Sequence, residues 1–418
     1  MRRVIVAASI GNCLEWFDFA VYGYLAVILG KLFFPTGNPT SSLLLSFAVF
    51  GAAFVVRPLG GMFLGPLGDR IGRRSVLCVV ILTMSAATFG IGLLPTYATV
   101  GVLAPILLVT LRLVQGFTAG GELTGATTFV AEYAPNDRRG FLTSWIQFSA
   151  TMGFLLGLAT PTVLTALLSP SDLSSWGWRI PFLVAGPVGA IGLYIRLRLK
   201  ETPDFRELSD EGEIAQRPLR ETLVKGWREI LLVGGIGITV HLGYFMVLVY
   251  MPTYLKNVLG FSPTTAFLAT ATAIGIDLLV IPFSGAMSDR WGRKPIMLWT
   301  SVAFVVGTVP LFLLIGQGGA AAVLGLGILG LLHGIYIGAS AAAFAEIFAT
   351  RVRFGGFSVG HNVSAAIFGG ATPLLATYLI SSTGNALSPA YIIVAGIALA
   401  IVAITVYKET AGLPLRRT

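Results

Sequence analysis

The chain has 418 residues, of which 55% are hydrophobic and only 11% are charged, and its mean hydropathy is +0.83. A soluble protein of this length would carry about 25% charged residues, so the composition excludes an ordinary soluble protein. The net charge of +9 would by itself allow a nucleic-acid partner, but the positions of the basic residues argue against one.

The apolar residues fall in repeated blocks of about 20, each long enough to cross a hydrocarbon layer of ~30 Å as an α-helix. In chain order the twelve predicted spans are 4–30, 41–68, 75–94, 101–131, 140–168, 179–198, 229–255, 264–287, 295–316, 321–349, 355–382 and 388–407. A transmembrane β-barrel would show short segments of alternating hydrophobicity instead. We therefore predict an all-α polytopic membrane protein.

The basic residues are distributed unevenly over the predicted loops. If residue 1 is cytoplasmic and the loops alternate, 23 of the 28 Lys and Arg residues fall on one side. This asymmetry follows the positive-inside rule and predicts two cytoplasmic termini in a bacterial-type inner (plasma) membrane. The basic residues then set the orientation of the chain in the membrane, and we expect no nucleic-acid partner. Because no cleavage site of small residues follows Met1–Arg3, we expect the first helix to remain as an uncleaved anchor.

The first span carries polar residues within the stretch GNCLEWFDFAVYGYLA. Helical spacing places a polar and aromatic stripe on one face, with Asp18 at its edge. Its members are Asn12, Glu15, Phe19 and Tyr22. A charged side chain in hydrocarbon costs roughly 2.5–3.5 kcal/mol on insertion scales, so this stripe should face the protein interior. Glu15 is nearer its centre than Asp18 and is the better candidate for carrying a proton.

The loop after the second span has a copy in the second half of the chain. Residues 65–74 read GPLGDRIGRR and residues 285–294 read GAMSDRWGRK, at an offset of 220. A second echo consists of two pairs, each seven residues apart: Glu132 with Arg139, and Glu346 with Arg353. Six spans therefore occur twice in the same order, so the repeat axis runs along the membrane normal.

The repeat divides the chain into three predicted parts. These are an N-terminal six-helix half (1–198), a cytoplasmic linker (199–228) and a C-terminal six-helix half (229–418). The linker is the long polar stretch of the chain.

Charged residues cluster where the repeated loops meet the cytoplasmic ends of the spans. In each copy an aspartate ends one helix, where it can pair with loop arginines or face the N-terminus of another helix. Arg73 or Arg74 can also reach Glu132 at the end of the fourth span. Such pairs hold while the inner side is shut and break when it opens, so we predict a cytoplasmic gate. Its residues are Asp69, Arg70, Arg73, Arg74, Glu132, Asp289, Arg290, Arg293, Lys294 and Glu346.

The fourth span repeats the pattern of polar residues on one helical face. Arg112, Gln115 and Glu122 share that face. Arg112 can hold a substrate carboxylate or the acids of the first helix. Glu122 can be a second proton carrier or the partner of a cationic group. A purely structural pair between Arg112 and a carboxylate is the alternative.

Two further charges lie at symmetric depth in the two halves. Arg57 precedes Asp69 by twelve residues, and Asp277 precedes Asp289 by twelve. A cation and an anion so placed can flank one zwitterion or serve as separate outer gates.

Aromatic residues of the first and seventh spans offer π faces, each worth roughly 0.5–2 kcal/mol to an ammonium group. Ordinary helix packing explains most of them, and only Trp16, Phe19 and Tyr22 are predicted to contact substrate. His241, His333 and His361 show no metal spacing, so we predict no metal site and no cofactor. His333 is near the position equivalent to Arg112, but we expect a hydrogen-bonded core histidine rather than a proton carrier.

These motifs resemble those of the major facilitator superfamily. The repeated G-x-x-x-D-R-x-G-R-[RK] loop and RLVQGFTAGGE (112–122) are similar to its signatures. More narrowly, the chain resembles the metabolite:proton symporter branch. The stretches that carry this likeness are residues 11–26, RPLGG (57–61), GGELTGATTFVAEYAP (120–135), WGWRIPF (176–182) and KETPDF (200–205).

The resemblance implies the major facilitator fold, with twelve helices in two pseudo-symmetric six-helix halves. It also implies a secondary active transporter that works by alternating access and takes up substrate against its gradient with protons. Within the branch, the run of these segments is similar to the symporters of zwitterionic osmolytes such as proline and glycine betaine.

We therefore predict a proton-coupled symporter that imports a small zwitterionic osmolyte or amino acid. The alternative is symport of a di- or tricarboxylate or other organic acid, of the 2-oxoglutarate, citrate or shikimate type, with Arg57 and Arg112 as the two cations. Glu15, Asp18 and Glu122 beside these arginines favour the zwitterion.

Other classes of membrane protein lack support in the sequence. No Ser-His-Asp pattern or cofactor loop indicates an enzyme, and no G-x-x-x-x-G-K-[ST] loop indicates ATP-driven transport. A passive channel would carry filter loops or repeated charge rings. The expected partners are a small-molecule substrate, protons and the lipid bilayer around a monomer.

Overall fold

The computed structural model describes residues 1–214 and 218–417, without the side chains of residues 39 and 40. Within these residues the regular secondary structure is helical, with no strand. Twelve of the described segments are long and apolar enough to cross a membrane, which confirms the predicted number of spans.

Each of the first six spans contains one long helix, and the sixth also includes a short helix at its start. The spans are α1 (Arg2–Phe33), α2 (Pro39–Ile71), α3 (Arg73–Leu93), α5 (Leu103–Tyr133), α6 (Arg139–Leu167) and α8 (Ile180–Leu197). The short helices are α4 (Tyr97–Val100), α7 (Pro170–Ser175) and η1 (Gly177–Arg179). Two more, α9 (Pro203–Asp210) and α10 (Pro218–Lys225), lie between the sixth and seventh spans.

The last six spans include two composite ones. The seventh consists of α11 (Trp227–Leu242), η2 (Gly243–Tyr250) and α12 (Met251–Asn257). The eleventh consists of η3 (Thr350–Val352), α16 (Arg353–Ala365), η4 (Ala366–Gly370) and α17 (Thr372–Thr383). The others are α13 (Pro263–Trp291), α14 (Arg293–Gly316), α15 (Gly319–Ile347) and α18 (Ser388–Val406).

The two composite spans contain π-helical turns that the sequence analysis did not predict. Both η2 and η4 have the wider π geometry, which is rare and often occurs at functional sites. A π turn shifts the register of the side chains that follow it. In the seventh span the π-helical segment η2 contains Tyr244 and Phe245.

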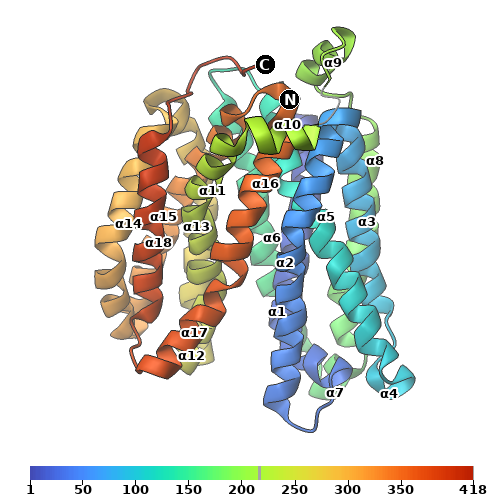
Figure 1. Cartoon of the computed structure of the whole chain (residues 1–418). Helices are drawn as coiled ribbons and strands as arrows, with labels where there is room; N and C mark the ends of the chain where they lie inside the picture. The colour runs from blue at the N-terminus through green and yellow to red at the C-terminus, as the bar shows by residue number, and fades with distance from the viewer. Residues whose placement is uncertain (215–217, 418) are drawn as a thin grey trace.

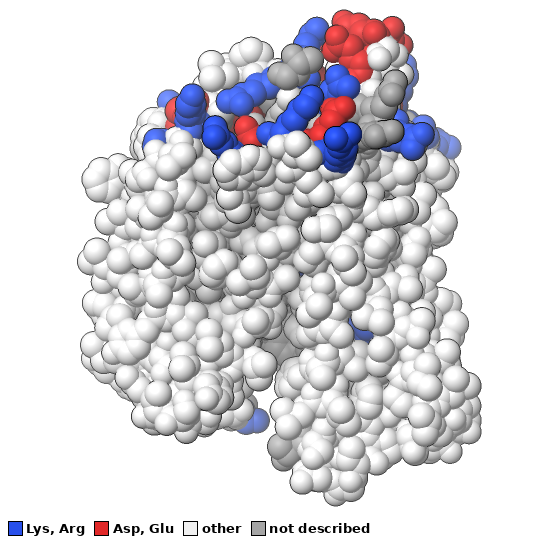
Figure 2. Space-filling model, in the orientation of Figure 1, with Lys and Arg blue, Asp and Glu red and all other residues white. Residues whose placement is uncertain are grey.

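The long helices run side by side, and both chain termini, α9 and α10 lie at the same end of the molecule (Figure 1). Most Lys, Arg, Asp and Glu side chains visible in Figure 2 gather at this end, and the flanks are almost uncharged. We call it the charged end; it carries residues 1–3, α9, α10 and residues 407–417. An apolar flank of this kind suits contact with lipid.

The first and last six spans pack closely near the charged end. There α2 lies against α16, and α6 lies against α13. Glycines permit this approach: a Cβ on Gly285 would collide with the Gly140 carbonyl oxygen, and one on Gly65 would collide with Gly355. At the opposite end the space-filling surface is hollowed between two lobes (Figure 2). The molecule is therefore shut at the charged end and hollowed at the other.

Candidate functional site

A buried ion pair lies midway along the first two spans. Glu15 on α1 and Arg57 on α2 form a salt bridge, and their side chains are 0% and 3% exposed. Three aromatic rings surround the Arg57 guanidinium, with their centres 5.1–5.3 Å from its carbon: Trp16, Phe19 and Phe54. Within the described residues, Glu15 Oε2 has no hydrogen-bond partner. An anion, a cation and aromatic faces thus meet at one point.

A second buried pair joins the first and fourth spans. Asp18 Oδ2 accepts a hydrogen bond from Arg112 at 2.7 Å. Arg112 also donates to Gln115 at 2.9 Å, and Gln115 donates to Thr88 at 2.7 Å. The Arg112 guanidinium lies over the Tyr22 ring, 4.2 Å from its centre. Of the two roles predicted for Arg112, the structure shows the one in which it holds an acid of the first helix.

Glu122 pairs with Arg196, which the sequence analysis did not single out. Arg196, at the end of α8, binds both carboxylate oxygens of Glu122. It also donates to the carbonyl oxygens of Ala7, Ala8 and Leu77 at 3.1, 3.3 and 2.7 Å. Arg196 therefore ties α1, α3, α5 and α8 together. No spacing within α5 points to α8, so the sequence held no signal for this pair beyond the need of Glu122 for a counter-ion.

Asn12 connects the same face of α1 to α6. Its amide donates to the Ile146 carbonyl oxygen at 2.7 Å and to Ser149 Oγ at 2.9 Å. Close packing brings these helices together, since a Cβ on Gly153 would collide with the Cys13 carbonyl oxygen. Asn12 thus fixes α1 against α6 in this state.

In the second half, Asp277 on α13 bonds to groups from both halves. Asp277 Oδ1 is 2.8 Å from His333 Nδ1, and Asp277 Oδ2 accepts from Thr151 of α6 at 2.9 Å. His333 Nε2 is 3.3 Å from the Val240 carbonyl oxygen. Both ring nitrogens of His333 thus face acceptors, which agrees with the hydrogen-bonded core histidine that the sequence analysis expected.

An aromatic cluster joins the two sets of charges. The rings of Trp16 and Tyr244 stack with centres 5.5 Å apart and planes inclined by 14°. Phe154 lies 5.0 Å from Trp16 and 5.6 Å from Tyr244, and Tyr244 contacts the His333 ring at 4.6 Å. The cluster therefore runs from the Arg57 guanidinium in the first half to the Asp277–His333 pair in the second. We take these charges and rings as the candidate central site.

At the charged end, the first loop copy holds the eleventh span. Asp69 accepts hydrogen bonds from the backbone N–H groups of Phe354 and Gly355 at 3.2 and 2.7 Å, at the start of α16. A carboxylate at a helix N-terminus is favoured by the unpaired N–H groups and by the helix dipole. Arg73 lies 3.1 Å from Asp69 and 3.3 Å from Glu132. Arg353 reaches Glu132 across the halves at 2.8 Å.

The second loop copy holds the fifth span in the same way. Asp289 accepts from the N–H groups of Gly140 and Phe141 at 2.7 and 2.8 Å, at the start of α6. Arg293 pairs with Asp289 at 2.8 Å and with Glu346 at 3.2 Å. Arg139 reaches Glu346 across the halves at 2.9 Å. Each half thus caps a helix of the other, and the two networks match by the internal repeat.

The remaining predicted gate residues lie outside these two networks. Arg70 and Arg290 are exposed. The Arg74 guanidinium donates to the carbonyl oxygens of Arg196 and Leu197, and Lys294 Nζ donates to Thr405 O at 2.7 Å. Arg139 and Arg353, which the sequence analysis noted as an echo but did not place in the gate, make its cross-half ion pairs.

A second pair of acids caps the third and ninth spans. Glu201 accepts from the Arg74 N–H, and Glu409 accepts from the N–H groups of Arg293 and Lys294. Burial raises the pKa of Glu201 above its ordinary 4.5, although backbone N–H groups oppose the shift. Desolvation also opposes ionisation of Glu409, but its four backbone N–H donors outweigh it and lower its pKa below 4.5. A repeated Lys-Glu-Thr at 200–202 and 408–410 was the missed signal.

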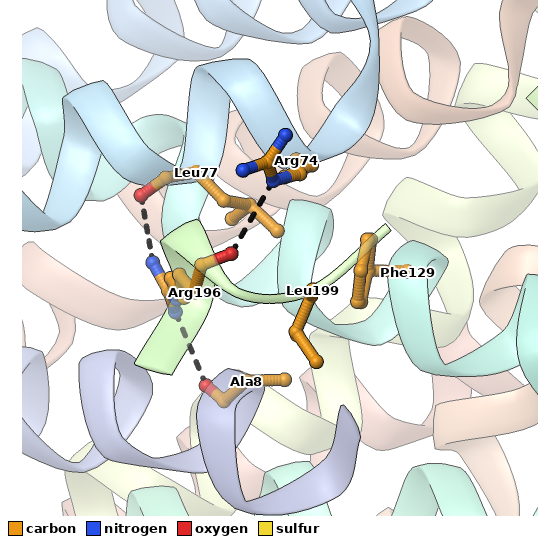
Figure 3. Close-up of a pocket in the computed structure, with 6 residues that line it drawn as sticks. All are labelled: Ala8, Arg74, Leu77, Phe129, Arg196 and Leu199. Atoms are coloured by element: carbon orange, nitrogen blue, oxygen red, sulfur yellow. Dashed lines mark hydrogen bonds between the residues drawn. The ribbon is translucent and has the colours of Figure 1, made fainter. Parts of the chain in front are cut away.

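A small pocket near the charged end is separate from the central site. It is lined by Ala8, Arg74, Leu77, Phe129, Arg196 and Leu199. Figure 3 shows Arg196 donating to the carbonyl oxygens of Leu77 and Ala8, while Arg74 donates to that of Arg196. The polar groups that line it are committed to the protein itself, so it serves packing. Among the described residues, no group of three or more His, Cys, Asp or Glu side chains is arranged to hold a metal ion.

Comparison with known proteins gives consistent matches in sequence and structure. The sequence profile of the Major Facilitator Superfamily matches residues 8–352 and 233–416. The proline/betaine transporter of Escherichia coli strain K12 is 40% identical over 427 residues, which cover 100% of this chain and 85% of the relative. The ectoine/proline transporter ProP of Corynebacterium glutamicum is 38% identical over 431 residues, covering 99% and 85%.

Among solved structures, the proton:xylose symporter XylE bound to 6-bromo-6-deoxy-D-glucose has a similar fold. It superposes with a TM-score of 0.82 at 19% sequence identity, over 99% of this chain and 97% of that chain. At this identity the likeness establishes the fold.

The buried pair of Arg196 with Glu122 should support stability. Replacing Arg196 by Met leaves the Glu122 carboxylate buried without a counter-ion, which costs about 3–5 kcal/mol when a buried pair is broken. We expect a melting temperature several degrees lower in thermal denaturation of the detergent-solubilised protein. Arg198→Met, two residues away and exposed, is the matched control. Equal melting temperatures for the two variants would contradict a structural role for Arg196.

The two helix-capping glutamates should give opposite pH trends in stability. Because the folded-state pKa of Glu409 is lowered, its contribution is full above pH 4.5 and is lost as the pH falls through that lower value. Because the folded-state pKa of Glu201 is raised, the stability that Glu201 contributes is full below pH 4.5. This contribution declines as the pH rises through the raised value. We expect the destabilisation by Glu409→Gln to be greatest near neutral pH and that by Glu201→Gln to be smallest there. Thermal melts of the two variants and the wild type from acid to neutral pH test this expectation. Parallel trends of the two variants with pH would refute it.

Proposed function

The chain belongs to the major facilitator superfamily, and from that premise we propose that it imports a small zwitterionic osmolyte, of proline or betaine type, together with protons. Members of this superfamily are transporters that work by alternating access, and the twelve-helix fold is theirs. The names of the relatives at 38–40% identity support a substrate that joins a carboxylate to a secondary or quaternary ammonium group.

We place the charged end in the cytoplasm. The basic side chains gather there (Figure 2), and cytoplasmic loops of membrane proteins are enriched in Lys and Arg. Both termini are then cytoplasmic, in the inner membrane of a bacterial-type cell. In this orientation the hollow of the surface faces the outside, and the inner end is shut. The parts that move are residues 1–198 and 229–418, joined by 199–228, within a monomer.

One observation carries the proposal: the Glu15–Arg57 pair is buried among aromatic rings midway through the bundle. A proton taken up by Glu15 removes its negative charge and frees the Arg57 guanidinium. Arg57 then accepts the carboxylate of the substrate in place of Glu15, so one proton enters for one carboxylate bound. When the substrate leaves on the inside, Glu15 releases the proton and the original pair re-forms.

The aromatic cluster supplies a site for the cationic end of the substrate. The stacked faces of Trp16 and Tyr244 lie next to Arg57, and Phe154 contacts both. An ammonium group over such faces gains roughly 0.5–2 kcal/mol per ring, without needing a hydrogen-bond acceptor. That suits a quaternary ammonium, which has no N–H to donate. Asp277, held by His333 and Thr151, adds negative charge on the far side of Tyr244.

The charge balance favours a zwitterion over a dicarboxylate. A dicarboxylate would need both Arg57 and Arg112 free, but Arg112 is held by Asp18 and Gln115 as well as by the Tyr22 ring. Freeing it requires a second proton on Asp18 and the loss of that network. A single carboxylate requires only the exchange at Arg57.

The gate explains how binding is linked to opening on the inside. Asp69 and Asp289 hold the N-termini of α16 and α6 from the opposite half, and Arg139 and Arg353 add the cross-half ion pairs. All of these bonds must break for the charged end to open. Because they are repeated in two copies, the shut state is stabilised on both sides of the interface.

Uptake into proteoliposomes with an imposed pH gradient tests the function, with proline, glycine betaine, 2-oxoglutarate and citrate compared in parallel. We expect proton-driven accumulation of proline or glycine betaine only. In Glu15→Gln the residue no longer exchanges a proton, so accumulation should fall to the equilibrium level while substrate exchange continues. Glu213→Gln, on an exposed residue between the two six-helix halves, is the control for loss of a carboxylate. Uphill uptake by Glu15→Gln at the wild-type level would refute the coupling role.

Loss of a gate aspartate should change rates rather than affinity. Asp69→Asn removes the charge at the start of α16 but leaves the central site intact. We expect net uptake to slow by about tenfold or more, because the shut state must re-form in each cycle and loses a charge-assisted contact worth ~1.5–3 kcal/mol. The apparent affinity should not change. Initial rates over a range of substrate concentrations measure both. A selective loss of affinity would contradict the gate role, and Arg70→Gln, on the exposed neighbour, controls for loss of charge alone.

A further inference from the structure

A short helix at the charged end turns apolar side chains away from the protein. The helix is α10, in the polar stretch between the sixth and seventh spans. Its buried residues, Pro218 and Thr222, are one turn apart and share the face that packs on the bundle. Leu219, Leu223 and Val224 are 38, 42 and 65% exposed. Apolar surface of this kind is unfavourable in water, so this face needs an apolar partner.

The position of α10 relative to the membrane is fixed by the seventh span. Only Gly226 separates it from α11, which begins at Trp227. The Gly226 N–H donates to the Thr222 carbonyl oxygen at 3.0 Å, and the Ile230 N–H donates to the Gly226 carbonyl oxygen at 2.9 Å. Trp227 and Leu231 are 50 and 65% exposed, and Trp is enriched at the boundary between membrane and water. The helix α10 is therefore level with this boundary.

The orientation of α10 agrees with this position, because it runs across the long helices rather than along them (Figure 1). It contacts α11, α16 and η3 on one side and α2 on the other. Thr222 is buried, and a Cβ on Gly355 of α16 would lie 3.2 Å from its hydroxyl oxygen. Glu221 forms a salt bridge of 3.1 Å with Arg351. The inner face of α10 thus covers the contact between α2 and α16 at the charged end.

The charged residues around α10 are sorted between its two faces. Its acid, Glu221, is paired with Arg351 of the protein. Arg220, Lys225 and Arg228 are exposed, and the described residues offer none of them an ion-pair partner. We call these three residues the basic triad. Basic residues beside an exposed apolar face are typical of helices that lie on an anionic membrane surface.

We propose that α10 is a membrane-surface helix in the leaflet at the charged end. Its three exposed apolar side chains lie among the lipid chains, and the basic triad binds anionic headgroups. A protein partner fits less well, because three side chains offer far less surface than the roughly 800 Å² per partner of a stable protein interface. This inference holds for any substrate. It also means that α10 separates the contact between α2 and α16 from the lipid.

Spin-label accessibility in vesicles of phosphatidylcholine and phosphatidylglycerol tests the lipid contact. In a Cys13→Ala/Cys78→Ala background, a nitroxide on Leu223→Cys should collide mainly with oxygen, which concentrates in lipid. A nitroxide on Glu213→Cys, an exposed residue before α10, should collide mainly with a water-soluble nickel chelate. We expect the ratio of oxygen to nickel collisions to be about tenfold higher at Leu223→Cys. Equal ratios would overturn the proposal. Low collision of Leu223→Cys with both reagents would also overturn it, because protein, such as a second copy of the chain, would then cover the face.

The basic triad is tested by changing the lipid. In vesicles of phosphatidylcholine alone, the ratio of oxygen to nickel collisions at Leu223→Cys should fall by about twofold or more, because the triad loses its anionic partners. Replacing all three members of the triad by Gln should abolish this difference between the lipids. Arg138→Gln/Arg198→Gln/Arg206→Gln, on three exposed residues of the same end, is the matched control and should preserve it. A difference that persists without the triad would overturn headgroup binding by these residues.

Discussion

A charged side chain inside a bilayer is stable only when another group neutralises it, and this requirement organises the molecule. Three buried ion pairs meet this requirement in the spans, Glu15–Arg57, Asp18–Arg112 and Glu122–Arg196, while Asp277 is hydrogen-bonded to His333 and Thr151. Each pair joins different helices, so neutralising a charge also fixes how those helices pack. A pair of this kind is also a device for coupling, because a proton added to the acid releases the cation for another anion. The Glu15–Arg57 pair has this property next to aromatic faces that suit an ammonium group.

The same constraint acts at the charged end with a different outcome. There the aspartates of the repeated loops pair with arginines and also cap helices of the opposite half. The bonds cross the interface, so they belong to one state of the molecule and must break in the other. The helices they hold, α6 and α16, also carry Thr151, which binds Asp277, and Asn362, which binds the Gly120 carbonyl. A change in the central site and a change at the gate therefore act on the same two helices.

Close packing makes these pairs possible. Glycines let helices approach until backbone and side-chain atoms touch: Cβ atoms on Gly11, Gly60 and Gly116 would collide with Glu122, the Phe117 carbonyl and Ala53. At Gly11 the space is filled by the Glu122–Arg196 pair itself.

The sequence by itself determined the features that depend on local spacing. The twelve spans follow from apolar length, the polar stripe of the first helix follows from the 3.6-residue turn, and the repeated loops are visible as an offset of 220. The tertiary structure alone decided which charge meets which. The partner of Glu122 is on α8, and the ion pairs across the gate come from Arg139 and Arg353. These partners are 74 to 221 residues apart in the chain. Helical periodicity fixes the face on which a side chain lies, but only the packing of helices fixes what lies across from it.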